Sequence, residues 1–427
     1  MTNLQHCSVR RSAALPLTVL HRGCRCYDEQ ECYARSKMAL GSSTKWSPMA
    51  GCGCMNTVGD GLDEDCNCIY MPYGDGASFS GYRAKPWPVP GTKTAENPEG
   101  ETLTFRGIKN IDGVIDWAMQ HGLKTATEFV LTGGSAGGLS TFLHADRVAA
   151  RVQAEAPKCK KIRAAPVVGY FLDHDNFAHD SASAVANTPS WNHANYTTWM
   201  RYIYKMQNLT FGSDGGLTKA CQEKHPEEPG LCFMSPHMQD VIKTPFFMFN
   251  SKYDAWQLGN EFQSTWTTKA EQAGVLQYGE DFLAQLAPVY KGGETKNGGM
   301  VRTTARKAAL LEGLSNDRLE APVLTPSSGA VQITSCICHG CPWPALKLAG
   351  KTSYEHYADW FYGKTTGAAS MHIDPSLPNG NGAGISTIDA ALFALTPNLL
   401  ASGTLQGGAY RGCAAFPDKP GQSDYIL

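Results

Sequence analysis

Residues 128–138 read Glu-Phe-Val-Leu-Thr-Gly-Gly-Ser-Ala-Gly-Gly, and this stretch decides the fold. Its first five residues form a short run that favours a β-strand. The next six are glycine and alanine around a single serine, Ser135, which predicts a tight turn. Residues 139–152 (LSTFLHADRVAARV) then predict a helix. The stretch is therefore a strand, a sharp turn and a helix.

Further elements repeat this alternation before and after the turn. Residues 104–122 place apolar side chains at helical spacing, and Gly122 is a suitable stop. Buried strands are predicted at 245–250 (PFFMFN) and 329–334 (GAVQIT), and a further helix at 353–362. Alternating strands and helices predict an α/β fold, a three-layer sandwich with a central, mostly parallel sheet and helices on both faces.

The turn carries a candidate nucleophile. Residues 133–137 match the pattern G-x-S-x-G, in which small residues let the backbone fold tightly and leave the Ser135 hydroxyl exposed. The backbone N–H of Ala136 would then lie at a helix N-terminus, where it is suited to stabilise an oxyanion. With a strand before it and a helix after it, the pattern indicates an α/β-hydrolase-like serine esterase. The alternative is a glycine turn in which Ser135 only caps the following helix.

A serine nucleophile needs a general base, and the base needs an orienting carboxylate. In this type of fold the order along the chain is Ser, then the acid, then His. Asp254 lies just beyond the predicted strand 245–250, where α/β sheets place functional groups. Of the twelve histidines, only His339, His356 and His372 follow it, and the last two fall in a predicted helix and in the C-terminal tail.

His339 is the predicted base because it follows the strand 329–334 in a short loop between Cys336 and Cys341. A disulfide there would limit the movement of the imidazole. Two alternatives stay open: Asp254 could simply cap a following helix, and His339 could bind a metal together with the neighbouring cysteines. For the serine mechanism we expect no metal and no organic cofactor.

Length and composition set wide bounds on function. The chain has 427 residues, of which 42% are hydrophobic and 18% charged, enough for a substantial core. The net charge of −2 and the absence of a basic run argue against a nucleic-acid partner. No run of about 18 apolar residues predicts a membrane span. We expect a monomer with three segments: an atypical or truncated N-terminus (1–25), an esterase domain (26–364) and a Gly/Ala/Ser/Pro-rich tail (365–427).

Fifteen cysteines favour an oxidising compartment with several disulfides. The sequons at Asn195 and Asn208 are compatible with glycosylation and secretion. Residues 13–20, interrupted by Pro16 and Thr18, make a poor signal peptide. Either an export signal is missing from this sequence, or the number of cysteines does not indicate an oxidising compartment. The close pairs expected to form disulfides are Cys26 with Cys32, Cys221 with Cys232, and Cys336 with Cys341. Three alternatives stay open for Cys52, Cys54, Cys66 and Cys68: disulfides, free thiols or a zinc site.

Nine segments in a fixed order over about residues 20–364 carry a resemblance to a known family. They are residues 26–32 (CYDEQEC), 41–43 (GSS), 75–81 (DGASFSG), 105–107 (FRG), 134–138 (GSAGG), 232–233 (CF), 242–245 (IKTP), 253–257 (YDAWQ), and Ser335-Cys336 with His339. Together they resemble the pectin acetylesterases of plants, with the animal carboxylesterase Notum as a more distant relative.

The resemblance implies an α/β-hydrolase-like fold, a secreted or cell-wall protein, and hydrolysis of acyl esters on a glycan or a lipidated protein. By position it implies Ser135, Asp254 and His339 as the catalytic triad, the same residues that chemistry and chain order select. The stretch 253–257 resembles the plant type more than Notum, which favours acetyl esters on a polysaccharide such as pectin. The pocket residues that the resemblance implies are Asp75, Ser78 and Trp256.

One segment departs from the family pattern. The family carries Leu-Glu-Gly-Gly-Gly-Trp-Cys, whose backbone N–H groups complete the oxyanion hole, whereas residues 20–26 read LHRGCRC. Only Gly23 remains of the three glycines, so the oxyanion donors here would be Ala136, Gly23 and Cys24. No strand is predicted ahead of this segment. Either the N-terminal region is truncated or mispredicted, or the hole has lost a donor, which costs about 10²–10³ in turnover.

Rival functions stay open at this point. A Notum-like enzyme would remove a lipid acyl chain in place of acetate. A catalytically impaired glycan-binding or interaction protein would keep the fold, and the altered segment 20–26 favours it. A metal-dependent deacetylase would lose its activity with chelators.

Overall fold

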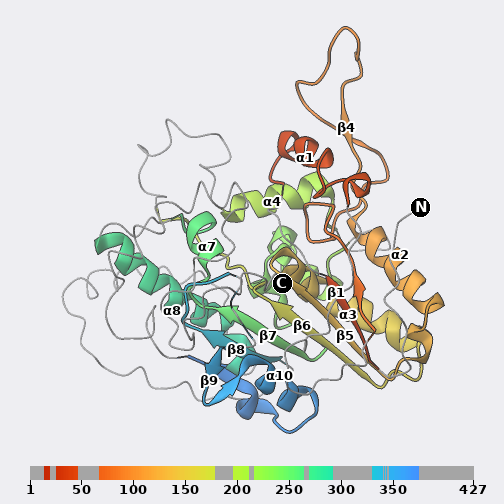
Figure 1. Ribbon diagram of the computed structural model, residues 1–427. Helices are drawn as coiled ribbons and strands as arrows, with labels where there is room; N and C mark the ends of the chain where they lie inside the picture. The colour runs from red at the N-terminus through yellow and green to blue at the C-terminus, as the bar shows by residue number, and fades with distance from the viewer. Residues whose placement is uncertain are drawn as a thin grey trace, which may run out of the picture. The chain divides into compact units, whose positions relative to one another are not determined.

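The computed structural model divides into two compact units (Figure 1). The first comprises Met1–Asp173, Thr188–Phe249 and Leu427, and the second His174–Asn187 and Asn250–Ile426. The division falls inside residues 26–364, which the sequence predicts as one domain. The structure describes residues 14–19, 26–46, 67–177, 196–210, 216–263, 269–291, 329–339, 341, 343 and 346–374.

The first unit is built on parallel strands. β5 (Glu128–Gly134) pairs with β1 (Ala14–Val19) on one side and with β6 (Lys161–Val167) on the other. β2 (Ile69–Tyr70) pairs with β1, and the first residues of β7 (Phe246–Ser251) pair with β6. The central residues of β5 are all buried, as expected of a parallel strand that is covered on both faces. The predicted α/β fold with a mostly parallel sheet is confirmed.

β1 corrects the prediction for the N-terminal region. No strand is predicted ahead of residues 20–26, yet β1 pairs with β5 from Ala14, opposite Glu128, to Val19, opposite Gly133. A short apolar run is compatible with a buried strand as well as with a signal sequence. Pro16 hides the strand from sequence analysis, because proline removes a donor from the ladder and is rare inside a sheet.

Two long helices supply much of the first unit's core. α2 (Gly107–Gln120) buries Ile108, Ile111 and Ile115, as the helical spacing predicts. These side chains share one apolar cluster with residues of β5 and of α3 (Ala136–Glu155). Shorter elements of this unit are α1 (Glu29–Ser36), η1 (Ser43–Lys45), η2 (Leu123–Thr125), α4 (Tyr196–Gln207), α5 (Lys219–Lys224), η4 (Pro229–Phe233) and α6 (Ser235–Met238).

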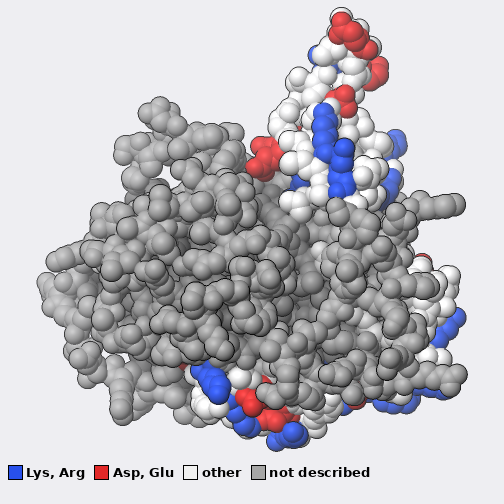
Figure 2. Space-filling view, in the orientation of Figure 1, with Lys and Arg blue, Asp and Glu red and all other residues white. Residues whose placement is uncertain are grey.

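A hairpin of β3 (Trp87–Pro88) and β4 (Thr102–Leu103) projects from the first unit. Glu96 and Glu99 are exposed on its connecting loop. Figure 2 shows acidic side chains at the tip of the hairpin. Like-charged side chains that remain in water cost little, so the loop requires no partner to be stable.

The second unit continues from the end of β7. Lys252 N–H donates to Thr334 O at 3.0 Å, which ties that end to β8 (Gly329–Thr334). β8 is buried along its length and pairs in parallel with β11 (Met371–Ile373). The remaining elements are α7 (Ala255–Asn260), α8 (Lys269–Lys291), β9 (Lys347–Leu348), β10 (Lys351–Thr352), α10 (Ser353–Phe361) and η5 (Gly367–Ser370).

η5 and β11 lie inside the segment 365–427, which the sequence assigns to a tail. The chain is therefore part of the second unit's structure at least to Asp374, and residues 375–427 lie outside the described part. None of the helices in the described ranges is both long enough and apolar enough to cross a membrane.

Candidate active site

Ser135 occupies a sharp turn between β5 and α3. Its backbone has φ 57° and ψ −119°, a conformation that costs a residue with a side chain free energy. The Ser135 N–H donates to Val167 O at 2.9 Å, which ties the turn to the end of β6. This is the strand–turn–helix geometry that the G-x-S-x-G pattern predicts.

Two glycines allow α3 to begin against the segment that follows β6. A Cβ built on Gly138 would lie 2.4 Å from Val167 O, and one built on Gly169 would lie 2.2 Å from the Gly138 carbonyl carbon. No real Cβ makes contacts this short, so both positions need glycine. Close backbone packing thus explains Gly138, the last glycine of the motif.

The Ser135 hydroxyl does not cap its own helix. Ser135 is the residue before α3, and its side chain makes no capping hydrogen bond, while its carbonyl accepts from Leu139 N–H at 3.0 Å. The alternative of a helix-capping serine is therefore wrong. Ala136 is the first residue of α3 and is buried, so its N–H belongs to a helix N-terminus as predicted.

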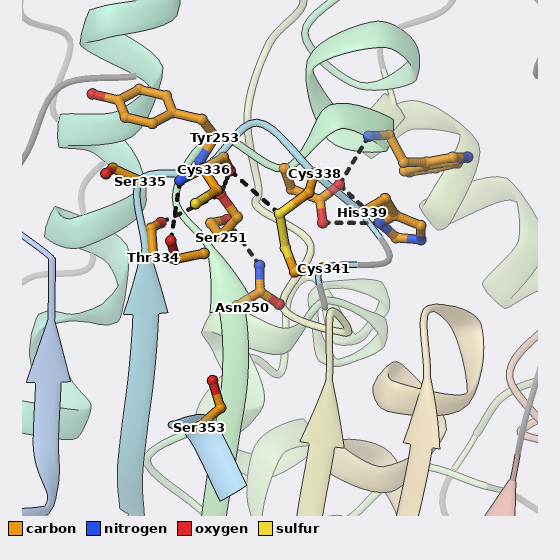
Figure 3. Close-up of a disulfide and its surroundings, with 12 residues drawn as sticks. Asn250, Ser251, Tyr253, Thr334, Ser335, Cys336, Cys338, His339, Cys341 and Ser353 are labelled. Carbon is orange, nitrogen blue, oxygen red and sulfur yellow. Dashed lines mark hydrogen bonds and ion pairs between the residues drawn. A yellow bond between two sulfur atoms is a disulfide. The ribbon is translucent and has the colours of Figure 1, made fainter. Parts of the chain in front are cut away.

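Asp254 and His339 meet in the second unit. Figure 3 shows His339 beside the disulfide of Cys338 and Cys341. His339 Nδ1 lies 2.9 Å from both carboxylate oxygens of Asp254. Asp254 is fully buried, and its Oδ1 also accepts from the backbone N–H groups of Trp256 and Gln257, at 3.0 Å each. The carboxylate therefore caps α7 and orients the imidazole at once.

This geometry suits a general base. When Nδ1–H of a neutral His339 donates to Asp254, the other ring nitrogen, Nε2, is left as an acceptor for a proton. The His339 side chain is 25% exposed, whereas that of Asp254 is 0% exposed, so the histidine is the member of the pair that is open at the surface. The Trp256 ring lies beside it, with the two ring centroids 6.1 Å apart.

The loop that carries His339 is cross-linked, although not as predicted. Cys338 pairs with Cys341, so the predicted pair of Cys336 with Cys341 is wrong. Spacing alone could not separate the two choices, because both cysteines lie within five residues of Cys341. With their sulfurs in a disulfide, Cys338 and Cys341 are not thiolate ligands, and no metal-binding group of three side chains occurs in the described ranges.

Two predicted pocket residues are buried within the first unit. Asp75 Oδ1 accepts from Ala77 N–H at 3.1 Å and from Phe79 N–H at 3.0 Å, and burial raises the pKa of Asp75. Ser78 is 0% exposed. These contacts hold the loop 75–81 in shape. That Asp75 and Ser78 line a substrate pocket stays a prediction.

His144 is a buried polar residue that sequence analysis missed. Its Nε2 lies 3.1 Å from both Ser80 Oγ and Ser78 O, and burial lowers its pKa to about 3. The sequence signal was a histidine within the predicted helix 139–152, between Leu143 and Ala145. The neutral imidazole of His144 thus supports the loop 75–81 from α3.

The remaining predicted positions have mixed outcomes. The pairs Cys26–Cys32 and Cys221–Cys232 are confirmed. Asn208 Nδ2, the atom that would carry a glycan, donates to Tyr82 O at 3.1 Å, so a glycan there would leave this nitrogen one N–H for the bond. The predicted residues that lie outside the described part of the chain are Gly23, Cys24, Cys52, Cys54, Cys66 and Asn195.

With this geometry in view, comparison with known proteins identifies the family. The family model described as Pectinacetylesterase matches residues 10–279, more than half of the chain. The chain belongs to the pectinacetylesterase family. This membership makes it a carboxylic ester hydrolase. Ser135 and Asp254 lie within the matched residues, and His339 lies beyond them.

Curated relatives agree with the family. Pectin acetylesterase 11 of Arabidopsis thaliana is 24% identical over 326 residues, 73% of this chain and 70% of that protein. Pectin acetylesterase 7 of the same plant is 26% identical over 327 residues, 74% of this chain and 68% of that protein. Palmitoleoyl-protein carboxylesterase NOTUM of Drosophila melanogaster is 25% identical over 249 residues, 57% of this chain and 33% of that protein.

A solved structure of similar fold is the Wnt deacylase Notum from Drosophila. It aligns with a TM-score of 0.63 and 20% identity, covering 88% of this chain and 93% of that chain. At this identity the likeness concerns the fold alone. It confirms the α/β-hydrolase-like architecture of this pectinacetylesterase-family chain.

Proposed function

We propose that this chain removes acetyl groups from a polysaccharide such as pectin, using Ser135, His339 and Asp254 as a catalytic triad. The observation that carries the proposal is the backbone of Ser135, held at positive φ between β5 and α3 in a chain of this family. The hydrogen-bonded pair of His339 and Asp254 supports it, because this pair is what a serine nucleophile requires.

The mechanism is a two-step acyl transfer. His339 Nε2 takes the proton of the Ser135 hydroxyl as its oxygen attacks the ester carbonyl carbon. The Ala136 N–H, with those of Gly23 and Cys24, stabilises the resulting oxyanion. His339 then gives its proton to the leaving sugar oxygen, and the acyl-enzyme remains on Ser135. Water, deprotonated by His339, attacks the acyl carbonyl carbon; the bond to Ser135 Oγ then breaks, His339 returns the proton to that oxygen, and acetate is released.

An acetyl substrate is supported by pectin acetylesterases 11 and 7 of Arabidopsis thaliana, which match over about 70% of both chains. The Notum relative of Drosophila melanogaster matches 57% of this chain and 33% of its own length. An acyl-length series of p-nitrophenyl esters from acetate to octanoate separates these substrates. A peak in kcat/KM at acetate supports the polysaccharide substrate, whereas a peak at the longer esters indicates a lipid acyl chain.

We place the protein outside the cell or in the cell wall. The disulfides Cys26–Cys32, Cys221–Cys232 and Cys338–Cys341 support this, because such bonds persist in oxidising compartments. Reduced thiols at these six cysteines, in protein isolated from its native compartment, would contradict this location.

The nucleophile is tested by labelling with a fluorophosphonate, which reacts with an activated serine. Wild-type protein should be labelled at Ser135, and Ser135→Ala should lose both the label and the hydrolysis of p-nitrophenyl acetate. Ser140→Ala is the matched control, since Ser140 is a buried serine on the same helix. Folded wild-type protein that takes no label would instead indicate an impaired, binding-only member of the family.

A further inference from the structure

Asp374 joins the two loops that carry the histidine and the aspartate of the candidate site. It follows directly on β11, beyond the predicted end of the enzyme domain. Asp374 N–H donates to Ile333 O at 2.8 Å, which fixes its backbone to β8. Two further contacts of Asp374 reach one residue at the start of each loop.

The first contact is with the histidine loop. Asp374 Oδ2 accepts from the Ser335 N–H at 3.2 Å and from the Ser335 hydroxyl at 2.5 Å. Ser335 is 1% exposed, so water cannot replace this acceptor. A buried donor pair that shares one carboxylate is held tightly, because each donor would be costly to leave without a partner. Ser335 is four residues from His339.

The second contact is with the aspartate loop. The Lys252 ammonium group donates to the backbone carbonyl of Asp374 at 3.0 Å. Lys252 is 2% exposed and lies two residues before Asp254. Burial lowers the pKa of Lys252, and the nearby charges of Asp374 and Glu280 partly oppose this shift.

Bonds between the loops themselves complete the arrangement, as Figure 3 shows in part. The Ser251 hydroxyl donates to Cys336 O, and Ala255 N–H donates to Cys338 O at 3.4 Å. These bonds set how the loops face each other. Asp374 bonds both loops from outside them, through its side chain to one and its main chain to the other.

We propose that Asp374 is a positioning residue that keeps His339 Nδ1 within hydrogen-bond distance of the Asp254 carboxylate. The inference deepens the proposed function, on which its catalytic consequence rests. Asp374 does not touch the reacting atoms. It acts through Ser335 and Lys252, and a loop displaced by about 1 Å is enough to cost 10²-fold in rate.

The test is Asp374→Ala, which removes the acceptor for Ser335 but keeps the main-chain carbonyl that accepts from Lys252. Ser335→Ala is the milder variant, since it removes the hydroxyl donor and keeps the N–H donor. Asp359→Ala is the matched control: Asp359 lies on α10 in the same unit and bonds to the Lys351 and Lys364 ammonium groups, away from both loops.

The decisive readout is the proton NMR signal of His339 Nδ1–H, observed in protein labelled with ¹⁵N-histidine. An imidazole N–H proton that is hydrogen-bonded to a carboxylate resonates far downfield, and this signal requires no substrate and no activity. We expect it to be lost or shifted upfield in Asp374→Ala, shifted less in Ser335→Ala, and unchanged in Asp359→Ala. We expect kcat for p-nitrophenyl acetate to fall at least tenfold in Asp374→Ala, with KM within twofold of wild type.

An unchanged His339 signal in folded Asp374→Ala overturns the proposal. If Asp374→Ala does not fold, an unchanged signal and unchanged kcat in Ser335→Ala overturn it equally. Failure of the proposed function is a separate result: wild-type protein would then show no fluorophosphonate labelling, while the NMR comparison would still report whether Asp374 positions His339.

Discussion

Asp254→Asn tests the proposed triad most directly. In the wild type, Oδ1 accepts from two backbone N–H groups at the start of α7, and both oxygens face His339 Nδ1 at 2.9 Å. Asparagine keeps one oxygen, which can still cap α7, but it presents an amide N–H₂ group to His339. Nδ1 must then accept a hydrogen bond, so the imidazole carries its proton on Nε2 and cannot take one from Ser135.

The loss of rate and the loss of stability should separate. We expect kcat for p-nitrophenyl acetate to fall by about 10³–10⁴, since the wrong tautomer costs about 10⁴ in a comparable Asp–His pair. The free energy of unfolding should change little, because the cap of α7 survives. Asp254→Ala should be equally inactive and should also lose about 1–2 kcal/mol of stability with the two capping bonds.

Steady-state kinetics and urea unfolding of both variants measure these effects. Asp359→Asn is the control, because it makes the same chemical change in the same unit without contact to His339. Wild-type kcat in Asp254→Asn would refute the role of Asp254. A loss of stability as large in Asp254→Asn as in Asp254→Ala would refute the argument from capping.

Three further changes test the packing around the site. Gly169→Ala would place a methyl group 2.2 Å from a backbone carbon at the start of α3, so unfolding should become easier by about 1–3 kcal/mol, whereas Gly113→Ala, in open space on α2, should not destabilise the chain. Since the pKa of His144 is about 3 in the folded chain and about 6.5 when unfolded, the unfolded chain binds one more proton between these values. Stability should therefore fall as the pH drops below 6.5, by up to about 1.4 kcal/mol per pH unit, and thermal melts of His144→Gln should show a shallower slope than wild type. Replacing Cys221 and Cys232 by serine opens a loop with a sequence separation of 11 and should lower the free energy of unfolding by about 3 kcal/mol; a loss below about 1 kcal/mol in urea unfolding would contradict this.

The parts of the site that could be predicted from sequence are those with local signals. The turn at Ser135 could be predicted from consecutive residues, because such a tight turn requires small side chains on both sides of the serine. Asp254 and His339 were found because each follows a strongly apolar strand, and because the chain order leaves few histidines. The structure places the two side chains in hydrogen-bond contact, which agrees with that reasoning.

The parts that could not be predicted depend on partners distant in sequence. β11 has only three residues, and it forms a strand because it pairs in parallel with β8. β1 contains Pro16, a residue that locally disfavours a strand. The pairing of β1 with β5 and β2 outweighs this preference. The choice of Cys338 over Cys336 as the partner of Cys341 follows from the shape of the loop. Asp374 fell in a segment assigned to a tail, so its contacts were invisible to sequence analysis.

The positive φ of Ser135 has an evolutionary consequence. A residue with a Cβ pays for this backbone shape, and glycine would adopt it at no such cost. An esterase under selection must keep the hydroxyl and bear the strain, whereas a descendant that no longer needs catalysis gains stability by changing this one codon. Inactive members of the lineage should therefore drift to glycine at this position more readily than to alanine, and such a replacement in a genome would mark an abandoned enzyme.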